Sequence, residues 1–247
     1  MTKPEHLTAI TFDVGQTLLY PHPTVGTVMS EVISRYGHSV PAAVFDARMG
    51  VFDRYYTEQY ERDESFWAEE ERQHAMWIGG FTHVCRAVEI EGDLSEITHA
   101  CYDEFDLASR WQLFEGVQET LAELKGRGYR LGVISNWGAG LEQLLDDIGI
   151  GHFFEVVTAS AAAGVHKPMP EAFTRTLGAL GVAPEHALHV GDHPTADIQG
   201  ARAVGMDAVL VRLGGNDDPT AEGELPADVE VITALPQLLE LVPEHVD

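Results

Sequence analysis

The second half of the chain alternates short apolar segments with segments whose apolar residues recur at every third or fourth position. The first pattern predicts buried strands and the second predicts helices that pack against them. Strands that alternate with helices form a parallel sheet covered on both faces, so this half predicts a three-layer α/β fold. The expected strands are "YRLGVISN", "FFEVVTAS", "HALHVGD" and "DAVLVRL". The expected helices are "GVQETLAELKGRG", "GLEQLLDDIGI", "PEAFTRTLGALG", "TADIQGARAVG" and "ITALPQLLELV".

The first half of the chain changes character after a single strand. "LTAITFDV" predicts a buried strand like the later ones, but residues from about 25 to about 107 predict only helices. The helical stretch is therefore expected to be a smaller domain inserted after the first strand. The predicted boundaries are residues 1–20 and 111–247 for the α/β domain and residues 21–110 for the inserted domain.

Polar side chains collect at the expected carboxyl ends of the strands. Asp13 ends the first strand, and Ser135 and Asn136 end the second. Asp192 ends a later strand, and Lys167 lies in a loop before a helix. Sites in open parallel sheets lie beyond the carboxyl ends of the strands. The sequence therefore predicts that two carboxylates, a hydroxyl and an amine meet at one edge of the sheet.

The charge balance restricts the partners of the chain. The 40 Asp and Glu residues outnumber the 15 Lys and Arg residues and give a formal net charge of −25. This charge repels nucleic acids and anionic membranes, so we expect neither as a partner. An anionic substrate would then require a metal ion or a well-placed lysine. The two cysteines, Cys85 and Cys101, lack metal-ligand spacing. With no secretion signal and no apolar run near ~18 residues, we expect a cytoplasmic protein.

Four motifs occur in order along the chain: "FDVGQTL", "VISN", "HKPMPEAF" and "HVGDHPTADIQGARAVGM". In this order and at these places on the expected strands, they resemble the motifs of the haloacid dehalogenase superfamily of hydrolases. The resemblance implies a Rossmann-like core and a helical cap of the first type, to which residues 112–119, "QLFEGVQE", form the return. It also implies a small-molecule substrate and a covalent intermediate on Asp13.

The residues themselves suit phosphoryl transfer, which depends on neutralising charge. Mg²⁺ prefers hard oxygen ligands and keeps several waters. The expected ligands are the carboxylates of Asp13 and Asp192 and the backbone carbonyl of Gly15. Asp197 is expected to hold a metal-bound water or to orient Lys167.

The other expected catalytic residues supply the nucleophile, the hydrogen-bond donors and a positive charge. Asp13 attacks phosphorus as the nucleophile. The hydroxyls of Thr17 and Ser135, with the backbone amides beside Ser135 and Asn136, donate hydrogen bonds to the phosphoryl oxygens. Lys167 supplies the positive charge that an acidic protein needs at such a site.

Several of these residues also have an ordinary structural interpretation. Asp192 and Asp197 can cap a helix. The spacing of His186 and His189 suggests a metal pair, but His189 lies in an apolar strand and is expected to be a packed core residue. The aromatic residues of the helical stretch are expected to pack helices together. They are Tyr55, Tyr56, Tyr60, Trp67, Trp77 and Phe81.

Gly15 departs from the family pattern. In the phosphatases of the family, the residue two positions after the nucleophile is usually an aspartate that protonates the leaving group. General acid–base catalysis contributes typically about 10²–10⁴-fold, so its loss is serious but not fatal. A glycine also permits positive φ, at which an aspartate would strain the loop. Gln16 replaces a usual glycine. Met169 replaces the usual aspartate of a "KPDP" string, which we interpret as structural.

Three functions are compatible with these departures. The first is a Mg²⁺-dependent phosphatase with a displaced acid or slow turnover. The second is a metal-independent dehalogenase-type hydrolase, because a halide leaves without a proton. The third is a non-catalytic binding protein of the same fold. The intact "GDHPTAD" favours the phosphatase, since it retains the two carboxylates expected near a metal ion.

Overall fold

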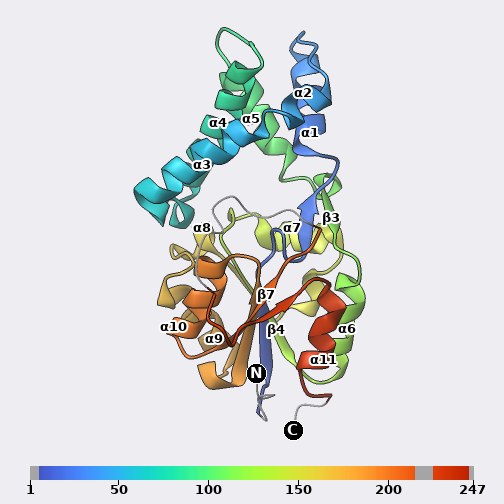
Figure 1. Ribbon diagram of the computed structural model, residues 1–247, viewed down its shortest axis with the longest axis vertical. Helices are drawn as coiled ribbons and strands as arrows, with labels where there is room; N and C mark the ends of the chain where they lie inside the picture. The colour runs from blue at the N-terminus through green and yellow to red at the C-terminus, as the bar shows by residue number, and fades with distance from the viewer. Residues whose placement is uncertain (1–5, 215–224, 245–247) are drawn as a thin grey trace. The chain divides into compact units, whose positions relative to one another are not determined.

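The computed structural model describes residues 6–214 and 225–244. The chain forms two compact units, which are described separately. The sheet unit comprises Met1–Tyr20 and Leu113–Asp247, and the helical unit comprises Pro21–Gln112. Figure 1 shows the strands of the first unit with helices around them and the helices α1 to α5 of the second unit. Among the described residues, the helices are all too short or too polar to cross a membrane.

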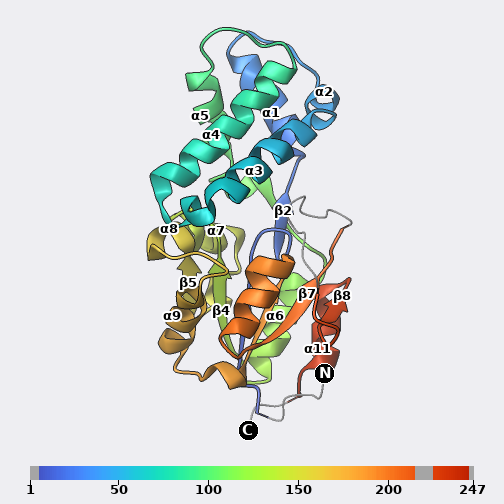
Figure 2. The ribbon, with the colours of Figure 1, turned by 60° about the vertical axis from the view of Figure 1, so that its left-hand side comes forward.

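The sheet unit is built on six parallel strands in the order β5-β4-β1-β6-β7-β8. The order runs outward from β1 in one direction through β4 and β5 and in the other through β6, β7 and β8. Figure 2 shows β4 and β5 on one side of the unit and β7 and β8 on the other. The crevice at such a reversal of strand order is where open α/β sheets bind ligands. The strands are β1 (Ala9–Phe12), β4 (Arg130–Ser135), β5 (Val156–Ala159), β6 (Ala187–Gly191), β7 (Asp207–Val211) and β8 (Glu230–Ile232).

Helices cover both faces of this sheet, which confirms the three-layer α/β prediction. Helices α9 and α10 lie on one face, and α6 and α11 lie on the other (Figure 1). Phe173, Leu177 and Leu180 of α9 pack into a buried apolar cluster with Ile134 of β4 and Leu210 of β7. The α-helices of this unit are α6 (Val117–Gly126), α7 (Leu141–Ile148), α8 (Ser160–Ala163), α9 (Pro170–Leu180), α10 (Gly200–Ala203) and α11 (Leu238–Leu241).

Two expected helices differ from the prediction. "ITALPQLLELV" begins as the end of β8, passes through a 3-10 turn, Leu235–Gln237 (η6), and becomes helical only in α11. The Gln237 side chain accepts the backbone N–H groups of Thr233 and Ala234, so these residues do not enter a helix. "TADIQGARAVG" begins as a π-helical turn, Pro194–Gln199 (η5), before α10. Two short 3-10 turns, Gly151–Phe153 (η3) and Pro184–His186 (η4), complete the unit.

The helical unit has its own apolar core. Gly80 of α4 allows α3 to approach closely, because a Cβ there would lie 2.3 Å from the Phe52 ring. Cys85 and Cys101 are free and buried in this core. The helices are α1 (Val25–Arg35), α2 (Ala42–Asp46), α3 (Met49–Asp63), α4 (Glu70–Ala87) and α5 (Ser95–Glu104), with 3-10 turns η1 (Glu64–Ala68) and η2 (Ala108–Arg110). A separate two-stranded sheet is formed by β2 (Leu19–Pro21) and β3 (Trp111–Leu113).

Candidate active site

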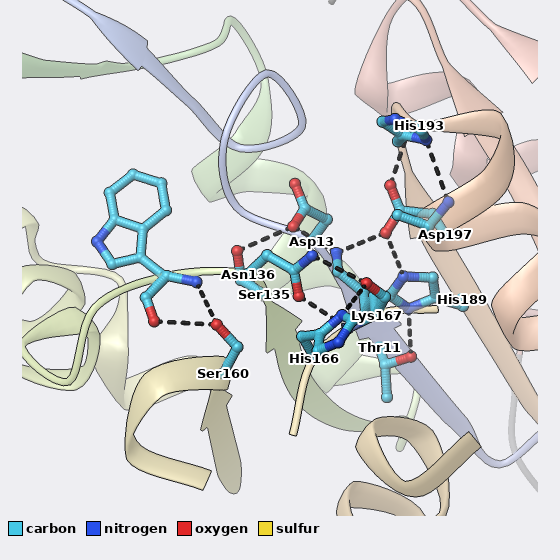
Figure 3. Close-up of polar contacts among 12 residues, drawn as sticks. Thr11, Asp13, Ser135, Asn136, Ser160, His166, Lys167, His189, His193 and Asp197 are labelled. Carbon is cyan, nitrogen blue, oxygen red and sulfur yellow. Dashed lines mark hydrogen bonds and ion pairs between the residues drawn. The ribbon is translucent and has the colours of Figure 1, made fainter. Parts of the chain in front are cut away.

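The polar side chains at the strand ends meet at Asp13, directly after β1. Ser135, the last residue of β4, donates from Oγ to Asp13 Oδ1 over 2.9 Å. Lys167 donates from Nζ to the same oxygen over 2.6 Å. Figure 3 shows the three side chains converging from separate parts of the chain. Both of these contacts with the Asp13 side chain go to Oδ1.

Lys167 lies between two carboxylates. Its Nζ donates to Asp197 Oδ1 over 2.5 Å as well as to Asp13. The Lys167 and Asp197 side chains are only 3% and 1% exposed, so water screens this ion pair little. Asn136 positions the lysine by holding its backbone. The amide oxygen of Asn136 accepts the Lys167 N–H over 2.8 Å, and its Nδ2 donates to the Lys167 carbonyl over 3.1 Å.

Burial and charge act in opposite directions on the pKa values of these groups. Burial disfavours the charged form of Lys167, but the neighbouring carboxylates Asp13 and Asp197 outweigh it and raise its pKa. Burial alone would raise the pKa of Asp197, but Lys167 and His189 hold that pKa well below its usual range. For Asp13, burial dominates the opposing effect of Lys167 and raises the pKa. The lysine is therefore a fixed cation beside Asp13.

The carboxylates form a group that suits a divalent cation. Asp13, Asp192 and Asp197 each offer an oxygen within 4.8 Å of the others, the one such acidic group in the described ranges 6–214 and 225–244. Hard oxygens are the ligands that Mg²⁺ prefers, so the donor set fits this ion. Arg212 donates from Nη1 to the Asp192 backbone carbonyl and fixes the loop after β6.

Asp197 is held by several partners. Its Oδ1 accepts from Lys167 and contacts His189 Nε2 at 3.0 Å, and its Oδ2 accepts the His193 N–H over 2.9 Å. A Cβ on Gly191 would lie 2.2 Å from the Asp197 Cγ, so only glycine leaves room for the carboxylate. The side chain that caps the turn η5 belongs to His193, whose Nδ1 accepts the N–H groups at its start, rather than to Asp192 or Asp197.

Two buried polar groups lie in the loop that follows Asp13. Thr17 is fully buried, and its Oγ has no hydrogen-bond partner within the described part of the chain. Gln16 Oε1 is buried and equally without a partner there. Unpaired buried polar atoms are costly and point to a missing ligand or water. The role of Thr17 in binding a substrate oxygen stays a prediction.

The Trp137 ring borders the space beside Gly15. A Cβ on Gly15 would lie 3.4 Å from Trp137 Cζ3, an ordinary van der Waals contact. The left-handed conformation expected of Gly15 is instead found at Gln16, with φ 55°. In the loop after β1, the residue with positive φ is therefore Gln16 rather than Gly15. Ser160 holds the Trp137 backbone, accepting its N–H over 3.0 Å and donating to its carbonyl over 3.3 Å.

Sequence reasoning missed the contributions of Trp137, Ser160 and His189. Trp137 directly follows Ser135 and Asn136, so its place after a motif was an available signal. His189 is fully buried, as a core residue should be, but its ring nitrogens contact Thr11 and Asp197. An imidazole inside an apolar strand gives no sequence sign of such partners.

Comparison with known proteins places the chain in a family. Residues 7–205 match the family model described as haloacid dehalogenase-like hydrolase. A human protein named haloacid dehalogenase-like hydrolase domain-containing protein 3 is 37% identical over 150 residues, which cover 61% of this chain and 58% of that protein. A phosphoserine phosphatase of Thermus thermophilus is 36% identical over 156 residues, covering 61% of this chain and 63% of the phosphatase. The chain thus spans about six tenths of the length of these curated relatives.

A solved structure shows the same fold along nearly the whole chain. It is a HAD-hydrolase of Bacillus subtilis bound to magnesium, which superposes with a TM-score of 0.74 at 19% identity. The match covers 96% of this chain and 99% of the Bacillus protein. The family match over residues 7–205, together with the parallel sheet and the strand-end residues, identifies the chain as a member of the haloacid dehalogenase-like hydrolase family.

Proposed function

We propose that the protein is a Mg²⁺-dependent phosphatase that acts on a small phosphorylated molecule through an aspartyl-phosphate intermediate. The observation that carries the proposal is the position of Asp13. It lies at the end of the central strand, bonded to Ser135 and Lys167, with oxygens of Asp192 and Asp197 within 4.8 Å of its own. The phosphoserine phosphatase among the relatives supports the reaction class.

Asp13 performs the covalent step. Its Oδ2 attacks phosphorus, the bond from phosphorus to the leaving oxygen breaks, and an acyl phosphate forms on the side chain. Water then attacks this phosphorus and releases phosphate and the free carboxylate. Lys167 and Ser135 hold Oδ1, so the nucleophile keeps one orientation during both steps. Thr17 and the backbone amide of Asn136 donate hydrogen bonds to the phosphoryl oxygens, while the single hydroxyl proton of Ser135 stays on Asp13 Oδ1.

The proposed metal site uses Asp13, the Gly15 carbonyl and Asp192. Bound there, Mg²⁺ would neutralise phosphoryl charge and align the substrate with the nucleophile. Asp197 contributes from further away, because Lys167, His189 and the His193 N–H already occupy its carboxylate. We assign it mainly to orienting Lys167, with a metal-bound water as its second role.

The leaving group determines which substrates suit this site. No acid stands at residue 15, and the Trp137 ring borders the space where one would lie. An indole cannot donate a catalytic proton to a leaving oxygen. We therefore propose substrates whose leaving group departs without protonation, such as acyl or aryl phosphates. The helical unit Pro21–Gln112 is the proposed cap that selects among them.

Hydrolysis of p-nitrophenyl phosphate tests the proposal, because nitrophenolate leaves without an acid. We expect Mg²⁺-dependent turnover that the Asp13→Asn variant loses. Activity retained in that variant would exclude the covalent mechanism.

The dehalogenase reaction is the second candidate, because the missing acid at Gly15 suits a halide leaving group. Incubation with L-2-chloropropionate and measurement of chloride separates the two reactions. Chloride release without metal would favour the dehalogenase. If neither activity is found, the third expectation, a non-catalytic binding protein, gains support.

A further inference from the structure

A continuous buried polar chain runs behind the nucleophile. Thr11 Oγ1 lies 2.8 Å from His189 Nδ1, and His189 Nε2 lies 3.0 Å from Asp197 Oδ1. The same Asp197 oxygen accepts from Lys167, which in turn reaches Asp13. Figure 3 shows this connection from Thr11 through His189 and Asp197 to the lysine.

The backbone of the sheet fixes the first link of the chain. Thr11 of β1 pairs directly with His189 of the adjacent parallel strand β6. Both side chains are fully buried. On the α9 side, the Phe173 ring meets the imidazole edge-on, with centroids 5.3 Å apart at 87°. The imidazole plane therefore has little freedom to turn.

Hydrogen-bond chemistry then gives each nitrogen one role. A carboxylate can only accept, so the His189 nitrogen that faces Asp197, Nε2, carries the proton. The other nitrogen, Nδ1, accepts from the Thr11 hydroxyl. Burial lowers the pKa of His189, in agreement with a neutral ring that has one proton to give. The competing acceptor for Thr11, the Leu188 carbonyl, is 3.5 Å away, so the histidine is the better partner.

We propose that His189 is a positioning residue that fixes the Asp197 carboxylate so that Lys167 stays beside Asp13. Asp197 has a second attachment, since the His193 N–H binds Oδ2. Without the His189 N–H, Oδ1 loses one of its two partners, and the carboxylate can turn to follow the lysine away from the nucleophile. The inference rests on the proposed use of Asp13 and Lys167 but is independent of the substrate.

The variants His189→Leu and His189→Gln separate hydrogen bonding from packing, and Thr11→Val tests the bond to Nδ1. His189→Leu fills much of the same space without a donor. His189→Gln can place an N–H near the position of Nε2 and keep the bond to Asp197. Thr11→Val removes the donor to Nδ1 while leaving Asp197 and Lys167 unchanged.

The first measurement does not depend on catalysis. The chain has three lysines, Lys3, Lys125 and Lys167, so ¹⁵N-lysine labelling gives few ammonium signals, and the buried one is assigned with Lys167→Arg. A buried ammonium held by two carboxylates exchanges its protons slowly and gives a visible signal. We expect this signal in wild type and His189→Gln and its loss or displacement in folded His189→Leu. An unchanged Lys167 signal in His189→Leu would overturn the proposal.

The tautomer of His189 is a second readout that needs no activity. Long-range ¹H–¹⁵N spectra are expected to show a proton on Nε2 in the wild type. In Thr11→Val we expect the Nδ1 shift to change and the Nε2 proton to remain. A proton on Nδ1 in the wild type would contradict the proposed orientation.

The affinity for orthovanadate in the presence of Mg²⁺ tests whether the buried polar chain affects the site around Asp13. We expect His189→Leu to bind vanadate about tenfold more weakly, as loss of a bond to a charged group implies, and His189→Gln to recover most of the affinity. If Gln binds as weakly as Leu, packing rather than the N–H is responsible and the proposal fails. If the wild type binds no vanadate, the proposed phosphatase function fails, and the two spectroscopic readouts decide the His189 inference alone.

Discussion

Asn136 holds the backbone of Lys167 through both ends of its side-chain amide, at 2.8 Å and 3.1 Å. The loop that carries Lys167 is thus attached to the residue that follows Ser135 at the end of β4. This attachment explains why an amide stands after the serine. Two neutral groups, one donor and one acceptor, match the two backbone groups of the lysine, and a carboxylate would match only one of them.

Asn136→Asp should therefore weaken the site more than its small change in size suggests. The variant loses the donor to the Lys167 carbonyl. It places a carboxylate oxygen against that carbonyl oxygen, and two acceptors repel each other. We expect turnover of p-nitrophenyl phosphate to fall at least about tenfold and the free energy of unfolding to fall by about 1–3 kcal/mol. Steady-state kinetics and urea unfolding measure the two effects. Gln118→Glu, at an exposed position in the first turn of α6, is the matched control, because a carboxylate is tolerated at the start of a helix.

Gly15→Asp tests whether only the acid is missing. The new Cβ would meet Trp137 at 3.4 Å, which is ordinary contact, and no positive φ at Gly15 opposes the change. We expect turnover of alkyl phosphates to rise, by up to about 10²–10⁴-fold, with little change for p-nitrophenyl phosphate. Gly15→Ala controls for the added bulk. A folded variant that binds Mg²⁺ without any gain on alkyl phosphates would show that residue 15 is not simply a vacant acid position.

Asp192→Asn should remove most of the Mg²⁺ affinity. The variant keeps the shape of the side chain but takes one anionic oxygen from the acidic group around Asp13. Calorimetric titration with Mg²⁺ measures the loss. Asp147→Asn changes an exposed side chain of α7 that accepts a hydrogen bond from Gln143, and it should bind Mg²⁺ like the wild type. Equal binding by Asp192→Asn and wild type would exclude Asp192 as a ligand.

Met169→Asp should stabilise the protein. Met169 occupies the N-cap position of α9 with φ −55° and ψ 131°, and its side chain makes no capping hydrogen bond. An aspartate there can accept from the free N–H groups of the first turn and interact favourably with the helix dipole. We expect a gain of about 1 kcal/mol in the free energy of unfolding. Met169→Ala, which adds no acceptor, should show no comparable gain in the same denaturant titration.

The helical unit should lose stability in acid through Glu104. Its carboxylate binds Arg35 and Arg110 at 2.7 Å each, and although burial opposes the charge, these bonds lower the pKa of Glu104. A carboxylate with a lowered pKa in the folded state stabilises the protein above its unfolded pKa of about 4.3 and loses this contribution as the pH falls further. Glu104→Gln should cost about 2 kcal/mol at pH 7. Urea titrations at pH 7 and pH 3.5 should show a smaller pH effect in the variant than in the wild type.

The edge of the sheet that carries Asp13, Ser135 and Lys167 was predictable because strand patterns give both the strands and their ends. The buried polar chain from Thr11 through His189 and Asp197 to Lys167 was not predictable. His189 sits where an apolar residue would fit the strand pattern equally well, and only the register with Thr11 shows what its nitrogens meet. The Gln237 side chain likewise converts a helical pattern at residues 233 and 234 into a turn, an event decided by one side chain rather than by periodicity.

The central position of β1 has a consequence for how the protein is made. This strand leaves the ribosome before the other strands of the sheet, yet both of its neighbours, β4 and β6, lie far along the chain. Asp13 and Ser135, which share a hydrogen bond in the finished protein, are 122 residues apart. During synthesis the segment Ala9–Phe12 has no partner strand until the residues up to β4 have been translated. Closing so long a loop slows folding. The residues around Asp13 thus come together only when β6 docks beside β1, and the nascent chain depends on protection of the apolar strand β1 until then.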